Sequence, residues 1–234
     1  MNIFENLLSG FSAADAVAVI YWWGAYFLLG WIVNNPPKSR ISVAVLMGDY
    51  RKGWMRQLVT RQPRIFDAAV LNSLQQGAAF FTSACMIVIG GCLALIGNSD
   101  KLNAVAVDLA IQSDRASLEL KIIMVLLLVA WALLKFMWSH RLFAYCAIMM
   151  AAVPNNRDEP NTYDLAARAA EINVTAGRSF NMGLRAVYFA IGALGWLLGP
   201  YVLLITTTAT VAMLVRREFF SASRKVMIAG LKLQ

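Results

Sequence analysis

The sequence predicts an all-α fold, a polytopic membrane helical bundle with about four transmembrane helices and additional amphipathic helices at the membrane interface. Hydrophobic residues make up 59% of the 234 residues and charged residues only 15%, whereas soluble domains are typically about 45–50% apolar and about 25% charged. A soluble fold of this length cannot bury so much apolar surface. A bilayer can accommodate it, because each spanning helix needs roughly 20 apolar residues.

The first predicted span covers residues 13–33, where an apolar run ends in Asn34-Asn35-Pro36-Pro37, a sequence that stops a helix. Asp15 lies near the start of this span, where an acidic residue suits the positive end of the helix dipole. The apolar residues of segment 1–11 share one helical face, so a short interfacial helix is expected before the span.

A basic connector follows at residues 34–76 and carries seven Lys and Arg residues against two Asp residues. In its middle, Tyr50, Trp54 and Leu58 recur every four residues, which places them on one face of a helix. We expect residues 48–60 to form an amphipathic helix on the membrane surface. The alternative is a solvated connector that makes no contact with lipid.

The second and third predicted spans cover residues 77–96 and 122–138. The second helix is expected to begin near Ile65, and it contains Gly90 four residues before Ala94, a pair of small residues that permits close helix approach. After the third span, the apolar run 142–153 is only about 18 Å long as a helix, too short to cross a bilayer. We therefore expect it to continue the third helix.

The last apolar block covers residues 186–215 and follows a mixed-charge connector, 154–181, in which a short helix is predicted over 163–175. The connector also contains Asn173-Val174-Thr175, a glycosylation sequon that is accidental if it faces the cytoplasm. Within the block, Gly195 and Gly199 form a GxxxG pair for helix packing, and Pro200 predicts a kink. A single kinked span is our first prediction, and a re-entrant hairpin broken at Gly199 and Pro200 is the alternative. The whole chain, 1–234, is then one integral membrane domain.

Positive charge sets the expected orientation, because Lys and Arg gather in cytoplasmic loops. The first connector carries seven such residues, the second connector three, segment 139–185 five and the C-terminal tail five. With four spans, an N-terminus outside places twelve of them inside and eight outside. We therefore expect a multi-pass protein of the bacterial inner membrane with a periplasmic N-terminus. The basic tail conflicts with this orientation, whereas the hairpin alternative would return the tail to the cytoplasm.

Three apolar stretches and the closing segment 216–221 carry a resemblance to a known family. The stretches read FFTSACMIVIGGCLAL from Phe80, FMWSHRLFAYCAIMMAAVP from Phe136 and FNMGLRAVYFAIGALGWLLGP from Phe180, and the closing segment reads RREFFS. Together they resemble the domain-of-unknown-function 599 family of bacterial and plant membrane proteins. The resemblance covers nearly the whole chain. It implies a multi-span membrane protein and no particular activity.

No catalytic constellation, metal-binding cluster or cofactor motif is evident in the sequence. There is a single histidine, His140, and the three cysteines do not have the spacing of metal ligands. The chain also lacks a phosphate loop, a zinc-protease motif and a nucleophile elbow.

The candidate binding site consists of polar residues at the ends of the predicted spans: Asn72, Gln75, Gln76, His140, Arg141, Asn181 and Arg185. On the four-span topology all of them lie at the cytoplasmic side and can converge. We expect Arg141 and Arg185 to meet near the cytoplasmic interface, because each lies where a span reaches the headgroup layer. Two facing arginines repel each other unless an anion, such as a lipid phosphate, lies between them. The alternative is ordinary interfacial anchoring of each side chain.

These observations predict a non-enzymatic membrane protein that acts by binding, as an accessory or scaffold subunit. The expected partners are anionic lipid headgroups and a second copy or another membrane protein. Nucleic acid is not expected, because the basic residues cluster between apolar runs. The alternative function is a small transporter or channel subunit, in which Gly199 and Pro200 would break a helix at the membrane midplane. A membrane enzyme is the third hypothesis.

The topology can be tested by cysteine accessibility in intact cells. Cysteines introduced at Arg56 and Asp108 should be labelled from the cytoplasm and the periplasm, respectively, because the second predicted span separates them. Labelling of both positions from the same side would contradict the arrangement of the first two spans.

Overall fold

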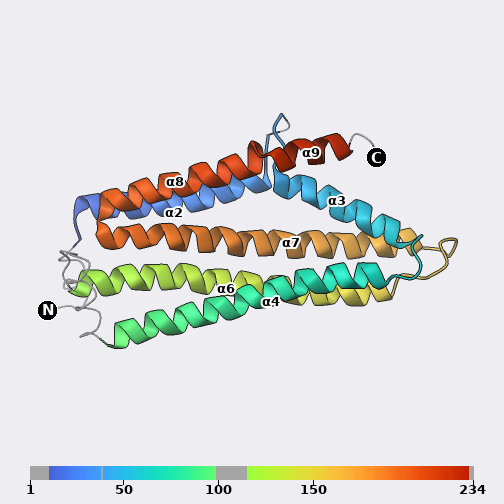
Figure 1. The fold of residues 1–234 in the computed structure, drawn as a ribbon, viewed down its shortest axis with the longest axis horizontal. Coiled ribbons are helices and arrows are strands. Elements are labelled where there is room, and N and C mark those ends of the chain that lie inside the picture. The colour runs from blue at the N-terminus through green and yellow to red at the C-terminus, as the bar shows by residue number, and fades with distance from the viewer. Residues whose placement is uncertain (1–10, 38, 99–114, 232–234) are drawn as a thin grey trace. The chain divides into compact units, whose positions relative to one another are not determined.

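In the computed structural model, which describes residues 11–37, 39–98 and 115–231, the chain forms helices joined by turns (Figure 1). The α-helices are α2 (Ala13–Asn34), α3 (Val43–Leu58), α4 (Ile65–Gly97), α6 (Arg115–Ala151), α7 (Thr162–Ala193), α8 (Pro200–Phe219) and α9 (Ala222–Leu231), with a 3-10 helix η1 (Leu194–Leu198) between α7 and α8. The all-α prediction is confirmed. The interfacial helix predicted over 1–11 lies outside the described residues, apart from Phe11, as does most of the second connector.

Four helical segments are long and apolar enough to cross a membrane: Ala13–Asn34, Ile65–Gly97, Ser117–Ala151 and Thr162–Leu198. A helix of 33 residues, such as α4, is about 50 Å long, whereas the hydrocarbon core is about 30 Å thick. A helix of this length that crossed a bilayer would therefore extend beyond its apolar layer. The continuation of the third predicted span through residues 142–153 is confirmed, because α6 runs unbroken to Ala151.

The last apolar block does not form one kinked helix, so our first prediction for residues 186–215 is wrong. Helix α7 ends at Ala193 and α8 begins at Pro200. Gly199, which precedes α8, has φ +122°, a value that favours glycine. Pro200 then occupies the first helical position, where its missing N–H costs nothing. Across this turn Thr206 Oγ1 donates to the carbonyl oxygen of Gly192 at 2.7 Å, so the alternative of a hairpin broken at Gly199 and Pro200 describes the backbone.

The two glycines predicted to pack helices have different roles in this hairpin. A Cβ added at Gly195 would lie 2.8 Å from the Thr206 side chain and 3.2 Å from that of Val202, so Gly195 lets η1 and α8 approach closely. A Cβ added at Gly199 would meet no atom within 4 Å. Gly199 therefore serves the backbone conformation of the turn rather than helix packing.

Residues 162–181, predicted as a connector with a short helix, instead form the first half of the continuous helix α7. The charged residues of this half, such as Arg168 and Glu171, are exposed. Its buried face is formed by alanines that recur at helical spacing: Ala166, Ala169, Ala170 and Ala176. The charges that suggested a connector occupy the exposed face of an amphipathic helix.

The chain divides into two compact units. The first comprises Met1–Trp31, Ala84–Ala132 and Leu184–Leu214. Its helices are joined by side chains that hydrogen-bond across helices: Trp22 Nε1 donates to the Phe189 carbonyl at 3.1 Å, and Trp131 Nε1 donates to Tyr26 Oη at 2.9 Å. Aromatic rings that carry a polar atom thus bury their apolar part and still satisfy that atom.

The second unit comprises Ile32–Ser83, Leu133–Gly183 and Val215–Gln234. Its core packs Met55 and Leu58 of α3 against Phe143 and Cys146 of α6 and the alanine face of α7. A second cluster consists of the rings of Phe81, Phe136 and Phe180, with centroids 5.1–5.7 Å apart. These separations are typical of favourable aromatic pairs.

Replacing Gly195 with leucine should destabilise the first unit, because the new side chain would overlap Thr206 and Val202 of α8. Leucine at Gly24 of α2 is a matched control, because a Cβ there meets nothing within 4 Å and leucine has the higher helix propensity. Thermal melting in neutral detergent should fall by several degrees for Gly195→Leu and not for Gly24→Leu. Equal melting of the two variants would contradict the close contact of η1 with α8.

Candidate functional site

The sequence-predicted polar residues are divided between the two units. Arg185 belongs to the first unit, and the other predicted residues belong to the second. In the second unit Gln75 Nε2 and His140 Nε2 lie 3.4 Å apart, which joins the entry of α4 to α6. Asn72 lies one turn before Gln75 on the same side of α4, where both residues line a cavity.

This cavity, between the first turns of α4 and the end of α6, has a volume of about 370 Å³. We call it the α4–α6 cavity. Its polar lining comes from Arg64, Asn72, Gln75 and Asn155, and its apolar lining from Leu58, Ala68, Leu71, Ala147, Met150 and Ala151. A mostly apolar wall with a few convergent polar groups is the usual composition of a small-molecule site, and the volume is within the common range of roughly 300–1,000 Å³.

Arg64 fixes one end of this cavity. Its guanidinium donates to the carbonyl oxygens of Val153 and Pro154, at 2.6 and 2.7 Å. Its Nε atom is buried and has no hydrogen-bond partner. A buried donor without a partner is costly, so the two bonds from the terminal nitrogens hold the Arg64 side chain in place against that cost. The sequence placed Arg64 only in a basic connector, because neither composition nor spacing shows which arginine reaches a helix end.

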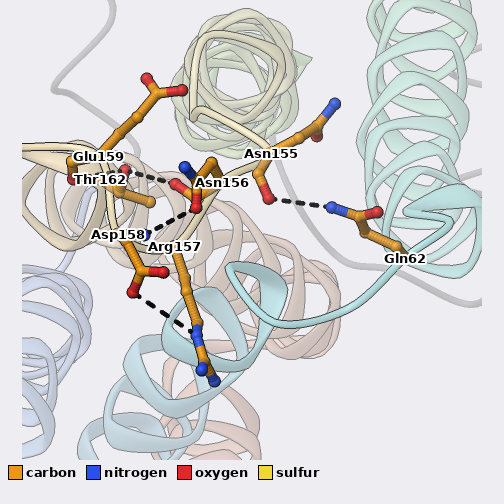
Figure 2. Close-up of polar contacts among 7 residues, drawn as sticks. All are labelled: Gln62, Asn155, Asn156, Arg157, Asp158, Glu159 and Thr162. Atoms are coloured by element: carbon orange, nitrogen blue, oxygen red, sulfur yellow. Dashed lines mark hydrogen bonds and ion pairs between the residues drawn. The ribbon is translucent and has the colours of Figure 1, made fainter.

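The loop between α6 and α7 closes the same end of the second unit (Figure 2). Gln62 Nε2 donates to the Asn155 carbonyl oxygen at 2.9 Å, and the Asp158 N–H donates to Asn156 Oδ1 at 3.1 Å. Thr162, at the start of α7, donates from Oγ1 to the Glu159 carbonyl oxygen at 3.0 Å. Backbone bonds supplement them, since the Glu159 N–H donates to the Asn156 carbonyl oxygen at 3.3 Å, so the loop satisfies several of its own polar groups.

The remaining sequence-predicted residues of the second unit do not line the α4–α6 cavity. Gln76 is exposed and is not among the lining residues, and Asn181 is half-buried on α7. Arg141 is exposed, donates from Nε to Tyr145 Oη one turn later and lies over that ring at 5.5 Å. The contacts of Arg141 are therefore with its own helix. Of the two adjacent glutamines, only Gln75 lies on the side of α4 that lines the cavity. The sequence alone did not distinguish it from Gln76.

A partly buried arginine of the second unit has neutral hydrogen-bond partners. Arg51 of α3 donates to the side-chain and backbone oxygens of Asn173 on α7 and lies over the Phe143 ring at 5.7 Å. Burial lowers the pKa of the Arg51 guanidinium, and the electrostatic interaction with the nearby Cys146 sulfur opposes that shift. Asn173 is fully buried and also donates to Cys146 Sγ at 3.4 Å.

A buried carboxylate lies at the junction of α3 and α4. Asp67 is fully buried, and its Oδ1 accepts hydrogen bonds from Trp54 Nε1, at 2.7 Å, and from Arg61. Its Oδ2 is buried without a partner. The ion pair with Arg61 compensates part of the desolvation of the carboxylate, so Asp67 ties the α3–α4 loop to the start of α4.

In the first unit, charged side chains are buried at the start of α2 and on α6 and α7. Ser12 and Asp15 form a reciprocal capping box, in which each side chain accepts the backbone N–H of the other. Asp15 Oδ1 also accepts from Trp196 Nε1 at 2.8 Å. Lys121 lies over the Trp196 ring at 5.9 Å, and Arg185 is 7% exposed beside Gly30. The helix-terminal role expected for Asp15 is therefore present, together with a tertiary contact that the sequence did not show.

The chemistry available at these sites is binding through hydrogen bonds and charge. In the described part of the chain, no three His, Cys, Asp or Glu side chains lie close enough to hold a metal ion. The α4–α6 cavity offers amide groups, a guanidinium and a neighbouring imidazole, which suit recognition of a polar or anionic group at the edge of an apolar wall.

A family model described as "Protein of unknown function, DUF599" matches residues 16–223. No curated protein and no solved structure matches the chain.

Removing the acceptor of Arg51 should destabilise the second unit. Asn173→Ala leaves the partly buried Arg51 guanidinium without its side-chain acceptor, a loss that typically costs about 1.5–3 kcal/mol for a hydrogen bond to a charged group. Thr175→Ala, two residues later on the exposed face of α7, is the control and should leave the stability nearly unchanged. Unfolding of the two variants in detergent measures the difference, and equal stabilities would show that Asn173 is not a necessary partner.

Proposed function

The chain belongs to the DUF599 family of proteins of unknown function, and from that premise we propose that it is a non-enzymatic membrane protein that acts by binding, as an accessory or scaffold subunit. The observation that carries the proposal is the exposure of α4. In the most apolar stretch of α4, only 6% of the residues are buried, compared with 28%, 33% and 44% in the corresponding stretches of the other three candidate spans. Most residues of this stretch are thus at least partly accessible to lipid or to a partner.

The residues on the outer face of α4 favour a protein partner over lipid. One set of exposed residues recurs along this helix at alternating spacings of three and four, and we call it the α4 stripe. Its members are Phe66, Ala69, Ser73, Gln76, Phe80, Ser83, Ile87, Gly90, Ala94 and Gly97. Most are small or polar, whereas a lipid-facing surface would be rich in large aliphatic residues. This spacing is that of helices that cross at a shallow left-handed angle, and small residues let their backbones approach.

The α4 stripe suits a second copy of this chain. Gln76 carries both a donor and an acceptor, as do the hydroxyls of Ser73 and Ser83, so each can pair with its own counterpart across a two-fold axis. A Cβ at Gly90 meets no atom within 4 Å in the part of the chain that the structure describes, which leaves room for another backbone at that point. We therefore propose a homodimer built on α4.

The hairpin at Gly199 supports an inner-membrane topology with the N-terminus outside. If α8 crosses back, the first connector, segment 139–185 and the tail all lie inside. Together they carry seventeen of the 21 Lys and Arg residues, whereas the second connector, outside, carries three. This asymmetry is larger than that of a four-span arrangement, and it removes the conflict created by the basic tail.

A second candidate function is a transporter or channel subunit. It is favoured by the charged residues Asp15, Lys121 and Arg185, which are buried within candidate spans of the first unit, since ionisable groups in spans often mark an ion path. The test is ion flux through liposomes that contain the purified protein, compared with liposomes that contain an Arg185→Gln variant. Equal flux with and without the protein would eliminate this candidate.

The homodimer can be tested by disulfide cross-linking in membranes. A cysteine at Ser83 should form a dimer on mild oxidation, because the stripe would place it opposite its own counterpart. A cysteine at Val88 is the control; Val88 is also exposed but lies about 140° around the helix from Ser83. The parent, with its three native cysteines, sets the background.

Native mass measurement of the detergent-extracted protein gives a second test of the same interface. Gly90→Leu should convert the dimer to a monomer without lowering monomer stability, because a Cβ at this position meets no atom of the described residues within 4 Å. Cross-linking from Val88 but not Ser83, or a Gly90→Leu protein with the parent mass, would contradict a dimer on α4.

A further inference from the structure

A second cavity in the second unit is lined mainly by basic and hydroxyl-bearing residues. It has a volume of about 320 Å³ and lies between the loop that precedes α3 and the junction of α8 with α9. Its polar lining comprises Ser39, Arg40, Ser221, Arg224 and Lys225. We call it the basic cleft. None of these residues belongs to the site that the sequence predicted.

The local structure holds these side chains in place. Ser221 caps α9 by accepting the Arg224 N–H at 3.2 Å, and the Arg224 Nε donates to the Ile41 carbonyl oxygen at 2.8 Å. The Arg40 guanidinium lies over the Phe220 ring, 4.5 Å from its centroid. The cleft is therefore formed by two tied segments rather than by freely moving side chains.

The charge around the basic cleft is strongly positive. On the segments 34–48 and 199–234, Glu218 is the only acidic residue. Its carboxylate accepts the backbone N–H of Ala44 at 3.1 Å, near the start of α3. Arg40, Arg224 and Lys225 thus gather three cations around one cavity. The N-terminus of α9 adds the partial positive charge of a helix dipole to the same place.

We propose that the basic cleft binds a phosphate group. The guanidinium groups of Arg40 and Arg224 supply forked donors, Lys225 supplies a compact positive charge, and the hydroxyls of Ser39 and Ser221 supply neutral donors. This combination matches the three acceptor oxygens and the negative charge of a phosphate. The volume suits a phosphate and a small substituent rather than a large ligand.

Two sources can supply this phosphate. The cleft follows directly on the apolar run of α8, and Phe220 beside it is 58% exposed, so a phosphate diester of an anionic lipid can bind with its acyl part against Phe220. A free phosphate or phosphomonoester can occupy the same donors from water. The phosphate group is common to both sources, and the experiment below separates them.

The experiment uses the full chain in a neutral detergent and measures the binding of two probes. Inorganic phosphate is titrated by calorimetry, and phosphatidylglycerol is titrated by native mass spectrometry. The test variant is Arg40→Gln/Lys225→Gln, in which both replaced side chains are exposed. The control is Arg56→Gln/Arg168→Gln, which removes the same number of charges from exposed positions of the same unit outside the cleft.

The parent and the control should bind at least one probe, and the test variant should lose about tenfold or more in affinity, the typical effect of removing a charge-assisted contact. Loss for phosphatidylglycerol alone identifies a lipid headgroup, and loss for phosphate alone identifies a soluble ligand. Lys225→Gln alone, which leaves the Arg40 contact with Phe220 intact, serves if the double variant does not fold. Absence of binding by the parent, or equal loss in control and test variants, would overturn the proposal.

Discussion

The packing of the second unit depends on how closely the backbone of α7 can approach α3 and α6. Its buried face carries the alanines Ala166, Ala169, Ala170 and Ala176, together with the polar residue Asn173. Small residues at such an interface allow helix backbones to approach and to exchange hydrogen bonds. Ser139 of α6 uses this proximity and donates from Oγ to the Ala176 carbonyl oxygen at 2.8 Å. The same proximity brings Asn173 within reach of both Arg51 and Cys146, so the polar interior of this unit follows from the alanine face.

Composition and apolar run length were sufficient to predict the fold class and the first three candidate spans. Each of these runs is apolar enough to specify a helix in lipid, and its neighbours contain clear breakers such as Pro36 and Pro37. The block 186–215 was different, because Pro200 can either kink a helix or begin one. The deciding property is the positive φ of Gly199, and a sequence does not show backbone dihedral angles. The first half of α7 was missed because its charged residues suggested a connector, although the spacing of its alanines was visible.

The candidate site could be predicted only in part, and helical phase explains the difference. Asn72 and Gln75 face the α4–α6 cavity and His140 lies beside Gln75, whereas Gln76 lies on the α4 stripe. One residue along a helix is about 100° of rotation, so adjacent glutamines have unrelated environments. Arg64 and the basic cleft were not predicted, because their members are far apart in the sequence and are joined only by the loops between helices. The predicted meeting of Arg141 with Arg185 stays a prediction, since these residues belong to different units.

The environment of Asn173 has a consequence for producing this protein in eukaryotic cells. Asn173-Val174-Thr175 has the sequence that oligosaccharyltransferase recognises, yet the asparagine side chain is fully buried and its oxygen and nitrogen are bonded to Arg51 and Cys146. A sugar on that nitrogen would require α3, α6 and α7 to separate. A chain that carried a glycan at Asn173 would therefore have acquired it before these helices packed, and the glycan would prevent the native packing of Asn173. In such a host the sequon would report on the order of glycan transfer and helix packing rather than on the membrane side of α7.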